Sequence, residues 1–235
     1  MIKFLTLIHL DFPPTGGLKF DICYLTLSTS MIIFPKTVHT IPELCRLLAV
    51  GQVIAAPTET AYGLLADALN FKAVRAVQKI KGRELGKPIA LIAGSVAQVK
   101  KYFFVTALNK KLINKFWPGA LTLLLKPRVK FPSSVVGLND YVGVRVSKSI
   151  WLRQVCLSLG RPITATSANL AGQPTIFDVK LVIKNLTSHG LKYVVDGGRL
   201  KSQSVSTVAL VSHGQINVLS EGIVSKIKLQ NTIKP

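Results

Sequence analysis

Hydrophobic and polar positions follow regular periods from Met31 onward, whereas residues 1–30 contain no convincing amphipathic period. Thr40 and Pro42 are typical of a helix cap and first turn, and the apolar positions after them stop at Gly51. Residues 52–56 follow as a short apolar run. The pattern therefore predicts a helix over 40–51 and then a buried strand.

A second helix is predicted from apolar residues that recur every three positions, namely Phe71, Val74, Val77 and Ile80. This helix would carry Lys81 and Arg83 to its C-terminal end. Further helical patterns cover 95–103 and 106–116, and strand-like patterns cover 88–93, 120–126, 141–147, 162–166, 192–196 and 205–211. Interleaved helices and strands predict one α/β domain with a twisted, mixed parallel and antiparallel sheet flanked by helices.

The chain divides into a main domain over 31–222, an N-terminal extension over 1–30 and a short basic tail over 223–235. The apolar run at residues 1–10 is too short to cross a bilayer, and Asp11 and the Pro-Pro-Thr-Gly-Gly turn interrupt it. We therefore expect no secretion, no membrane segment and a cytoplasmic location. We expect Met31 as the natural start, with a genuine N-terminal arm as the alternative.

The charge of the chain bears on its possible partners. The chain carries 30 Lys and Arg against 10 Asp and Glu, a formal net charge of +20. Such a surface favours nucleic acid, nucleotide phosphates or an anionic membrane face, but a solvated cationic surface without a specific partner fits charge alone equally well.

Cysteines and histidines offer little chemistry. Cys23, Cys45 and Cys156 have no CxxC spacing and lie among apolar residues, which is typical of reduced core thiols. The histidines are scattered without an HExxH motif, so we expect no built-in metal site.

Three loops carry residues suited to substrate binding, and each lies next to a predicted strand. Residues 57–64, Pro-Thr-Glu-Thr-Ala-Tyr-Gly-Leu, bring hydroxyls, a carboxylate and a phenol to one turn, although this segment taken alone favours an ordinary Pro/Gly turn with a helix cap. Residues 81–88, Lys-Gly-Arg-Glu-Leu-Gly-Lys-Pro, combine three cations with two glycines and suit a triphosphate. The alternative is a basic helix end, and the loop is not a Walker A motif.

The third loop, residues 162–175, follows a strand with small hydroxyl and amide side chains that suit a phosphate or an amino acid. GxSxG is absent, so we interpret Ser167 as a binding residue rather than a nucleophile. Arg145 lies inside an apolar strand, where its charge needs a ligand or a structural salt bridge.

Together these segments resemble the YrdC-type threonylcarbamoyl-AMP synthase family. The family pairs a K-x-R element with an S-x-N element, matched here by Lys81, Arg83, Ser167 and Asn169. Further matches are the PTET-x-YGL loop, the WPG-x-LT turn at 117–122, the V-x-VR strand and the DGG…ST region, in family order from about residue 50 to 210.

The resemblance implies a nucleotidyltransferase that converts L-threonine, bicarbonate and ATP into threonylcarbamoyl-AMP and pyrophosphate, with Mg²⁺ accompanying the nucleotide. Other proteins would then transfer the threonylcarbamoyl group to tRNA, and direct tRNA binding is compatible with the charge. Residues 31–222 would be the YrdC-like catalytic domain.

The resemblance also implies roles for individual residues. Lys81, Arg83, Ser167 and Asn169 would be catalytic. The threonine site would comprise Thr60, Arg145, Ser167 and Thr207, and the nucleotide site would comprise Lys81, Arg83, Lys87, Tyr141, Ala165, Asn169 and Thr175.

One position departs from the family. Where relatives often carry an arginine in L-R-x-G, this chain has Ser220 in Leu-Ser-Glu-Gly. Arg199 or a residue of the tail would have to supply that contact.

Two other classes of protein stay open at this point. A non-catalytic module of the same fold would bind tRNA or double-stranded RNA in a salt-sensitive way and consume no ATP. A carbamoyl-transferring maturation domain would usually lie in a longer chain with zinc-finger cysteines, and a sugar-phosphate synthase would need an acidic metal cluster.

Overall fold

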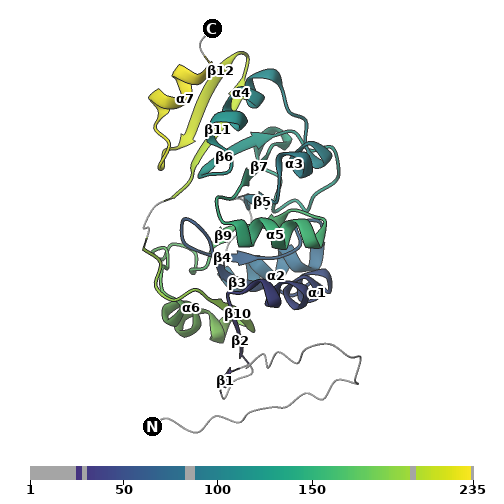
Figure 1. Ribbon diagram of the computed structural model, residues 1–235, viewed down its shortest axis with the longest axis vertical. Helices are drawn as coiled ribbons and strands as arrows, with labels where there is room; N and C mark the ends of the chain where they lie inside the picture. The colour runs from purple at the N-terminus through teal and green to yellow at the C-terminus, as the bar shows by residue number, and fades with distance from the viewer. Residues whose placement is uncertain (1–24, 28–30, 83–87, 202–204, 234–235) are drawn as a thin grey trace.

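The computed structural model describes residues 25–27, 31–82, 88–201 and 205–233. Its strands form two six-stranded mixed sheets, in the orders β1-β2-β10-β3-β4-β9 and β12-β11-β6-β7-β5-β8. In Figure 1 the first sheet lies in the lower part of an elongated molecule and the second in the upper part, with helices around both. The expected α/β fold with a mixed sheet is confirmed, although the strands divide between two sheets.

The first sheet contains β1 (Leu25–Leu27), β2 (Met31–Pro35), β3 (Ile54–Pro57), β4 (Tyr62–Leu65), β9 (Thr166–Ser167) and β10 (Tyr193–Asp196). The second contains β5 (Leu91–Ala93), β6 (Leu121–Leu125), β7 (Val142–Val146), β8 (Ile163–Thr164), β11 (Thr207–Ser212) and β12 (Gln215–Ser220). The helices are α1 (Ile41–Ala49), α2 (Phe71–Lys81), α3 (Val96–Tyr102), α4 (Ala107–Phe116), α5 (Ile150–Leu159), α6 (Val179–Leu186) and α7 (Lys226–Ile233), with 3₁₀ turns η1 (Val38–Thr40), η2 (Leu138–Asp140) and η3 (Thr187–His189).

The core lies on both faces of the central strands. In β3, Ile54 and Ala56 pack in one apolar cluster together with α1 and α5, whereas Ala55 belongs to the second cluster, because side chains alternate between faces along a strand. Cys45 of α1 is half-buried and Cys156 of α5 is buried, both as free thiols. Burial raises the pKa of both thiols, which agrees with their interpretation as core residues.

Helix α2 corrects one part of the sequence prediction. Val74, Val77 and Ile80 are buried as expected, but Phe71 is 52% exposed. A helix has about 3.6 residues per turn, so residues spaced by three drift around its axis and Phe71 leaves the core face. The buried face instead includes Ala73 and Lys81.

The two ends of α2 are fixed by local chemistry. The Asn70 side chain accepts hydrogen bonds from the backbone N–H groups of Lys72 and Ala73, both at 3.1 Å. Gly82 ends the helix in the left-handed conformation, with φ 58°. Lys81 is therefore held at the last turn, with its side chain only 5% exposed.

The two chain ends contain more structure than the sequence pattern indicated. β1 pairs with β2 in antiparallel register, Leu25 opposite Ile33. The segment expected as a basic tail contains α7, whose Leu229 is fully buried in the larger core cluster. Residues 1–24 and 28–30 lie outside the described residues, and the start at Met31 stays a prediction.

Candidate active site

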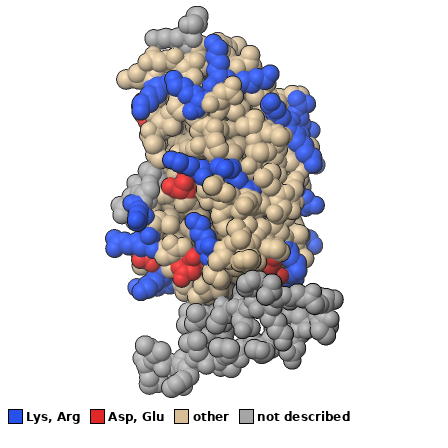
Figure 2. Space-filling model, viewed as in Figure 1, with Lys and Arg blue, Asp and Glu red and all other residues tan. Residues whose placement is uncertain are grey.

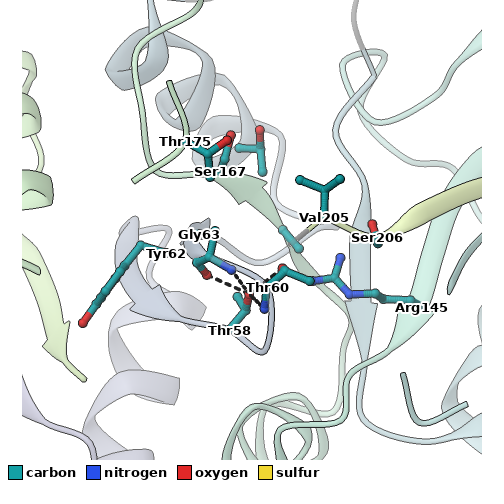
Figure 3. Close-up of a pocket in the computed structure, with 12 residues that line it drawn as sticks. Thr58, Thr60, Tyr62, Gly63, Arg145, Ser167, Thr175, Val205 and Ser206 are labelled. Atoms are coloured by element: carbon teal, nitrogen blue, oxygen red, sulfur yellow. Dashed lines mark hydrogen bonds between the residues drawn. The ribbon is translucent and has the colours of Figure 1, made fainter. Parts of the chain in front are cut away.

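A cavity of about 160 Å³ opens between the two sheets' loops (Figure 3). It is lined by residues from both sheets and from the segments that follow β9 and precede β11: Thr58, Thr60, Ala61, Tyr62, Gly63, Arg145, Ala165, Thr166, Ser167, Thr175, Val205 and Ser206. Five residues predicted from the sequence are therefore brought together, namely Thr60, Arg145, Ala165, Ser167 and Thr175.

The Thr58–Ala61 turn builds one wall. The Thr58 hydroxyl donates to the carbonyl oxygen of Ala61 at 2.7 Å and accepts from the backbone N–H groups of Thr60 and Ala61. Its oxygen also lies 2.9 Å from the Thr60 hydroxyl. Threonine side chains that bond their own backbone fix a tight turn, so the Thr60 hydroxyl is held at the cavity by this network.

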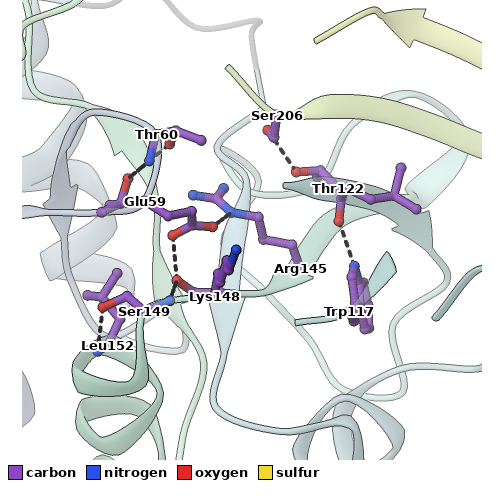
Figure 4. Close-up of polar contacts among 12 residues, drawn as sticks. Glu59, Thr60, Trp117, Thr122, Arg145, Lys148, Ser149, Leu152 and Ser206 are labelled. Atoms are coloured by element: carbon purple, nitrogen blue, oxygen red, sulfur yellow. Dashed lines mark hydrogen bonds and ion pairs between the residues drawn. The ribbon is translucent and has the colours of Figure 1, made fainter. Parts of the chain in front are cut away.

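Arg145 of β7 supplies a buried cation to the cavity. Its Nε donates to Glu59 Oε1 at 3.1 Å, and the Ser147 hydroxyl donates to the other carboxylate oxygen (Figure 4). The side chains of Arg145 and Glu59 are 5% and 13% exposed. Because the ion pair uses Nε, the end of the guanidinium points across the cavity toward Thr60 (Figure 3).

The charge of Glu59 is maintained by its partners. Burial alone would raise the pKa of this carboxyl, but the Arg145 charge and the hydrogen bond from Ser147 lower it below its ordinary value. Glu59 is therefore ionised at neutral pH and holds Arg145 in place. The structural ion pair considered for Arg145 from the sequence is present, and its place in the cavity lining leaves the ligand-binding role as a prediction.

Lys81 lies behind the S-x-N loop rather than in the cavity lining. Its Nζ donates to the carbonyl oxygens of Ser167 at 2.6 Å and Asn169 at 2.9 Å. The Ser167 hydroxyl oxygen lies 3.2 Å away and Asn169 Oδ1 3.3 Å away. One ammonium group thus ties the K-x-R helix to the S-x-N loop.

Asn169 closes the same loop on itself. Its Nδ2 donates to the carbonyl oxygens of Leu170 at 2.9 Å and Gln173 at 2.6 Å. Its side chain is therefore used within the loop, and Asn169 does not line the cavity. Ser167, by contrast, pairs with Gly63 across β9 and β4 and faces the cavity.

Two other predicted residues lie away from the cavity lining. The Thr207 hydroxyl donates to the carbonyl oxygen of Val224 at 2.7 Å and accepts from the N–H groups of Gly222 and Val224, so its hydrogen-bonding capacity is used in holding the segment after β12. Tyr141 lies under the Lys126 ammonium, 4.7 Å from its ring centre. Arg83 and Lys87 fall outside the described residues.

Several lining residues were not predicted as site residues, and Ser206 is the most instructive. It precedes Thr207 in the same S-x-S-T run, lines the cavity and accepts a hydrogen bond from Thr122 at 3.1 Å (Figure 4). Side chains alternate along an extended chain, so of two adjacent hydroxyls only one faces the cavity. The sequence pattern did not indicate which of the two it would be.

Ser220, which stands where relatives often carry an arginine, and Arg199, the suggested substitute, both lie away from the cavity lining in the described part of the chain. Ser220 is exposed at the end of β12, opposite Val208. Arg199 is also exposed, and its backbone pairs with that of Asp178 in an isolated antiparallel β-bridge. Neither lines the cavity.

Tyr62 connects the cavity wall to the Asp-Gly-Gly-Arg loop. Its ring is fully buried, and its hydroxyl donates to the carbonyl oxygen of Gly198 at 2.8 Å and accepts from the N–H of Gly197 at 2.9 Å. Burial raises its pKa to about 12, so the phenol stays protonated and keeps donating. Gly197 packs closely here, since a Cβ would lie 2.6 Å from Pro57 Cγ.

We predict that Tyr62→Phe lowers the free energy of unfolding by about 1–3 kcal/mol, because it leaves a loop N–H and a carbonyl without their partner. Urea denaturation measures this change. Tyr102→Phe is the control, since within the described part of the chain the Tyr102 hydroxyl makes one hydrogen bond, to the carbonyl of Gly160 at 3.0 Å, and a smaller loss is expected. Equal losses in both variants would contradict the role of Tyr62 as a bridge.

The family comparison agrees with this geometry. A family model for the Sua5/YciO/YrdC domain, described as telomere recombination, matches residues 46–222. The chain belongs to the Sua5/YciO/YrdC family. The resemblance noted from the K-x-R and S-x-N elements is thus confirmed.

Individual relatives of this family lie at moderate identity. A protein of Vibrio cholerae named threonylcarbamoyl-AMP synthase is 36% identical over 163 residues, 68% of this chain and 86% of its own. A Methanocaldococcus jannaschii relative is 35% identical over 179 residues, 76% of this chain and 84% of its own.

Among solved structures, P. abyssi Sua5 complexed with L-threonine superposes with a TM-score of 0.78 at 27% identity. The match covers 85% of this chain but only 58% of the Sua5 chain.

Within the described ranges, no group of three or more His, Cys, Asp or Glu side chains is arranged to hold a metal ion. No helix in the described part of the chain has the length and apolar character needed to cross a membrane. Lys and Arg are far more numerous than Asp and Glu on the face shown in Figure 2, and they spread along its whole length.

Proposed function

We propose that this protein is a threonylcarbamoyl-AMP synthase, which converts L-threonine, bicarbonate and ATP into threonylcarbamoyl-AMP and pyrophosphate. The observation that carries the proposal is the hydroxyl-lined cavity with one buried arginine at its wall. Support also comes from the relatives that bear this name and from the related Sua5 structure with L-threonine.

The cavity chemistry fits a small zwitterion. The guanidinium of Arg145 would bind the carboxylate of threonine, because planar Arg groups pair well with carboxylates. Thr60, Ser167 and Ser206 would hydrogen-bond its polar atoms. At about 160 Å³ the cavity is smaller than the roughly 300–1,000 Å³ typical of drug-sized ligands, so it suits the amino acid rather than the whole nucleotide.

The reaction needs positioning more than a protein nucleophile. A neutral threonine amine would attack the carbon of bicarbonate, with loss of water. A carboxylate oxygen of the fragile carbamate would then have to displace pyrophosphate from the α-phosphate of ATP before the carbamate decarboxylates. Holding the reactants together in a site with little water would supply much of the rate. The Lys81 charge beneath the Ser167 loop would favour negative charge developing on the phosphates.

The remaining roles are proposals of the same kind. Arg83, Lys87, Tyr141, Ala165, Asn169 and Thr175 would surround the nucleotide. Mg²⁺ would arrive with the ATP phosphates, since no Asp or Glu is among the described residues that line the cavity and Glu59 is already held by Arg145 and Ser147. Other proteins would transfer the threonylcarbamoyl group to tRNA.

The proposal predicts threonine-dependent release of pyrophosphate from ATP, with threonylcarbamoyl-AMP detected by mass spectrometry. Ser167→Ala should lower this activity by about 10²-fold, the size typical of losing a transition-state hydrogen bond. Ser158→Ala, at an exposed serine of α5 that does not line the cavity, should leave it unchanged. ATP-independent, salt-sensitive RNA binding without pyrophosphate release would instead identify a non-catalytic RNA-binding module.

A further inference from the structure

A second cleft of about 280 Å³ lies between α2 and the segment that precedes η2. It is lined by Phe71, Lys72, Arg75, Gln78, Pro132, Ser133 and Ser134. None of these residues lines the central cavity. The chemistry proposed for the central cavity therefore leaves this cleft without a role.

Phe71 gives the cleft an exposed aromatic surface. It occupies the first turn of α2, outside the buried face, and is 52% exposed. The helix does not need this ring for its start, because the Asn70 side chain caps it. A half-exposed aromatic ring in a cleft is a surface on which a planar base can stack.

Cations and hydrogen-bonding groups stand beside the ring. Lys72 and Arg75 are exposed and lie on the same helix. The Ser134 hydroxyl lies 2.7 Å from Gln78 Oε1 and donates to it, which leaves the Gln78 amide N–H groups as donors toward a ligand. In the sequence between Asp67 and Asp140, Glu84 is the single acidic residue, so anions meet little repulsion here.

We propose that this cleft binds a nucleotide unit, with its base stacked on Phe71 and its phosphate against Lys72 and Arg75. A planar π-surface beside two cations matches a nucleobase that carries a phosphate, and matches neither a purely apolar ligand nor a base-free anion. The net charge of +20 favours a nucleotide within an RNA strand over a free one, because a strand brings further phosphates to the surrounding surface. The proposal does not depend on the synthase activity.

The test is fluorescence anisotropy of a labelled 12-nucleotide single-stranded RNA with the full chain. Phe71→Ala should lower the affinity for this RNA by about tenfold, the effect expected for losing one base stack. Phe104→Ala is the matched control, because Phe104 is 51% exposed but lies outside the cleft. Lys72→Gln should also weaken binding, whereas Lys110→Gln on α4 should have a smaller effect.

Two further probes identify what the cleft recognises. Inorganic tripolyphosphate has no base, so its affinity should be equal for wild type and Phe71→Ala. If AMP displaces the labelled RNA with a Kd that depends on Phe71, the cleft is assigned to free nucleotides. If AMP does not displace the RNA, the cleft is assigned to RNA. Unchanged RNA binding in Phe71→Ala, an equal loss in Phe104→Ala, or an equal loss for tripolyphosphate would overturn the proposal.

Discussion

Replacing Lys81 with methionine is expected to lower threonine-dependent pyrophosphate release by about 10²–10³-fold, the range seen when a charge-stabilising donor is removed. Lys81 is 5% exposed, and its ammonium lies within hydrogen-bonding distance of four oxygen atoms of Ser167 and Asn169. Methionine keeps the unbranched apolar stem of the side chain but is one atom shorter and offers no donor. The loop that carries Ser167 would therefore lose its connection to α2.

The same substitution should cost stability. It leaves the buried carbonyl oxygens of Ser167 and Asn169 without the ammonium, and each unsatisfied buried group costs about 1–3 kcal/mol. Denaturant unfolding and steady-state kinetics on the same preparation separate this loss from the catalytic one, since activity is measured where the variant is folded.

Lys79→Met is the matched control for Lys81→Met. Lys79 lies two residues earlier on α2 but is exposed, so its substitution should change stability by no more than about 0.5 kcal/mol and leave activity intact. Activity of Lys81→Met within threefold of wild type would show that the ammonium neither holds the loop nor supports the reaction.

The sequence predicted which segments meet better than where their side chains lie. Lys81, Ser167 and Asn169 come together as the K-x-R and S-x-N pairing implies, because the end of α2 and the loop after β9 meet. That Lys81 is buried and holds the loop was not predicted. Three-residue spacing left Lys81 outside the predicted apolar stripe, at the C-terminal end of the helix, whereas the 3.6-residue period turns it toward the core.

Side-chain direction and strand pairing explain the other differences. Ser206 rather than Thr207 faces the cavity, since the Thr207 hydroxyl binds the segment around Gly222. Residues 62–64 were interpreted as part of a loop, but they belong to β4, which lies between β3 and β9. Such pairing depends on residues about a hundred positions away, which local periodicity does not reveal.

The pair between Glu59 and Arg145 gives the second large expected effect. Glu59→Gln should raise KM for threonine by about tenfold with a smaller change in kcat, because Arg145 would lose the charge that holds its guanidinium at the cavity wall. The amide retains the shape of the carboxylate and can still accept from Arg145 Nε. A loss in kcat alone would contradict this positioning role.

Acid unfolding tests the same pair independently of activity. The pKa of Glu59 is lower in the folded protein than its ordinary value of 4.5. A carboxyl with a depressed pKa stabilises the fold above its unfolded-state pKa, and this contribution disappears as the pH falls through the folded-state value. The free energy of unfolding of Glu59→Gln should therefore fall less steeply than that of wild type below about pH 4.5.

Glu43→Gln controls for the general loss of a carboxylate. Glu43 pairs with Arg46 at 2.6 Å on α1, but the Arg46 side chain is 63% exposed, and exposed ion pairs contribute little to stability. At neutral pH Glu59→Gln should destabilise the fold clearly more than Glu43→Gln does, because it leaves the Arg145 charge buried without its counter-ion. Identical pH profiles and identical stabilities for the two variants would show that Glu59 is no more than a surface carboxylate, and Arg145 would then have to be positioned by the β7 backbone alone.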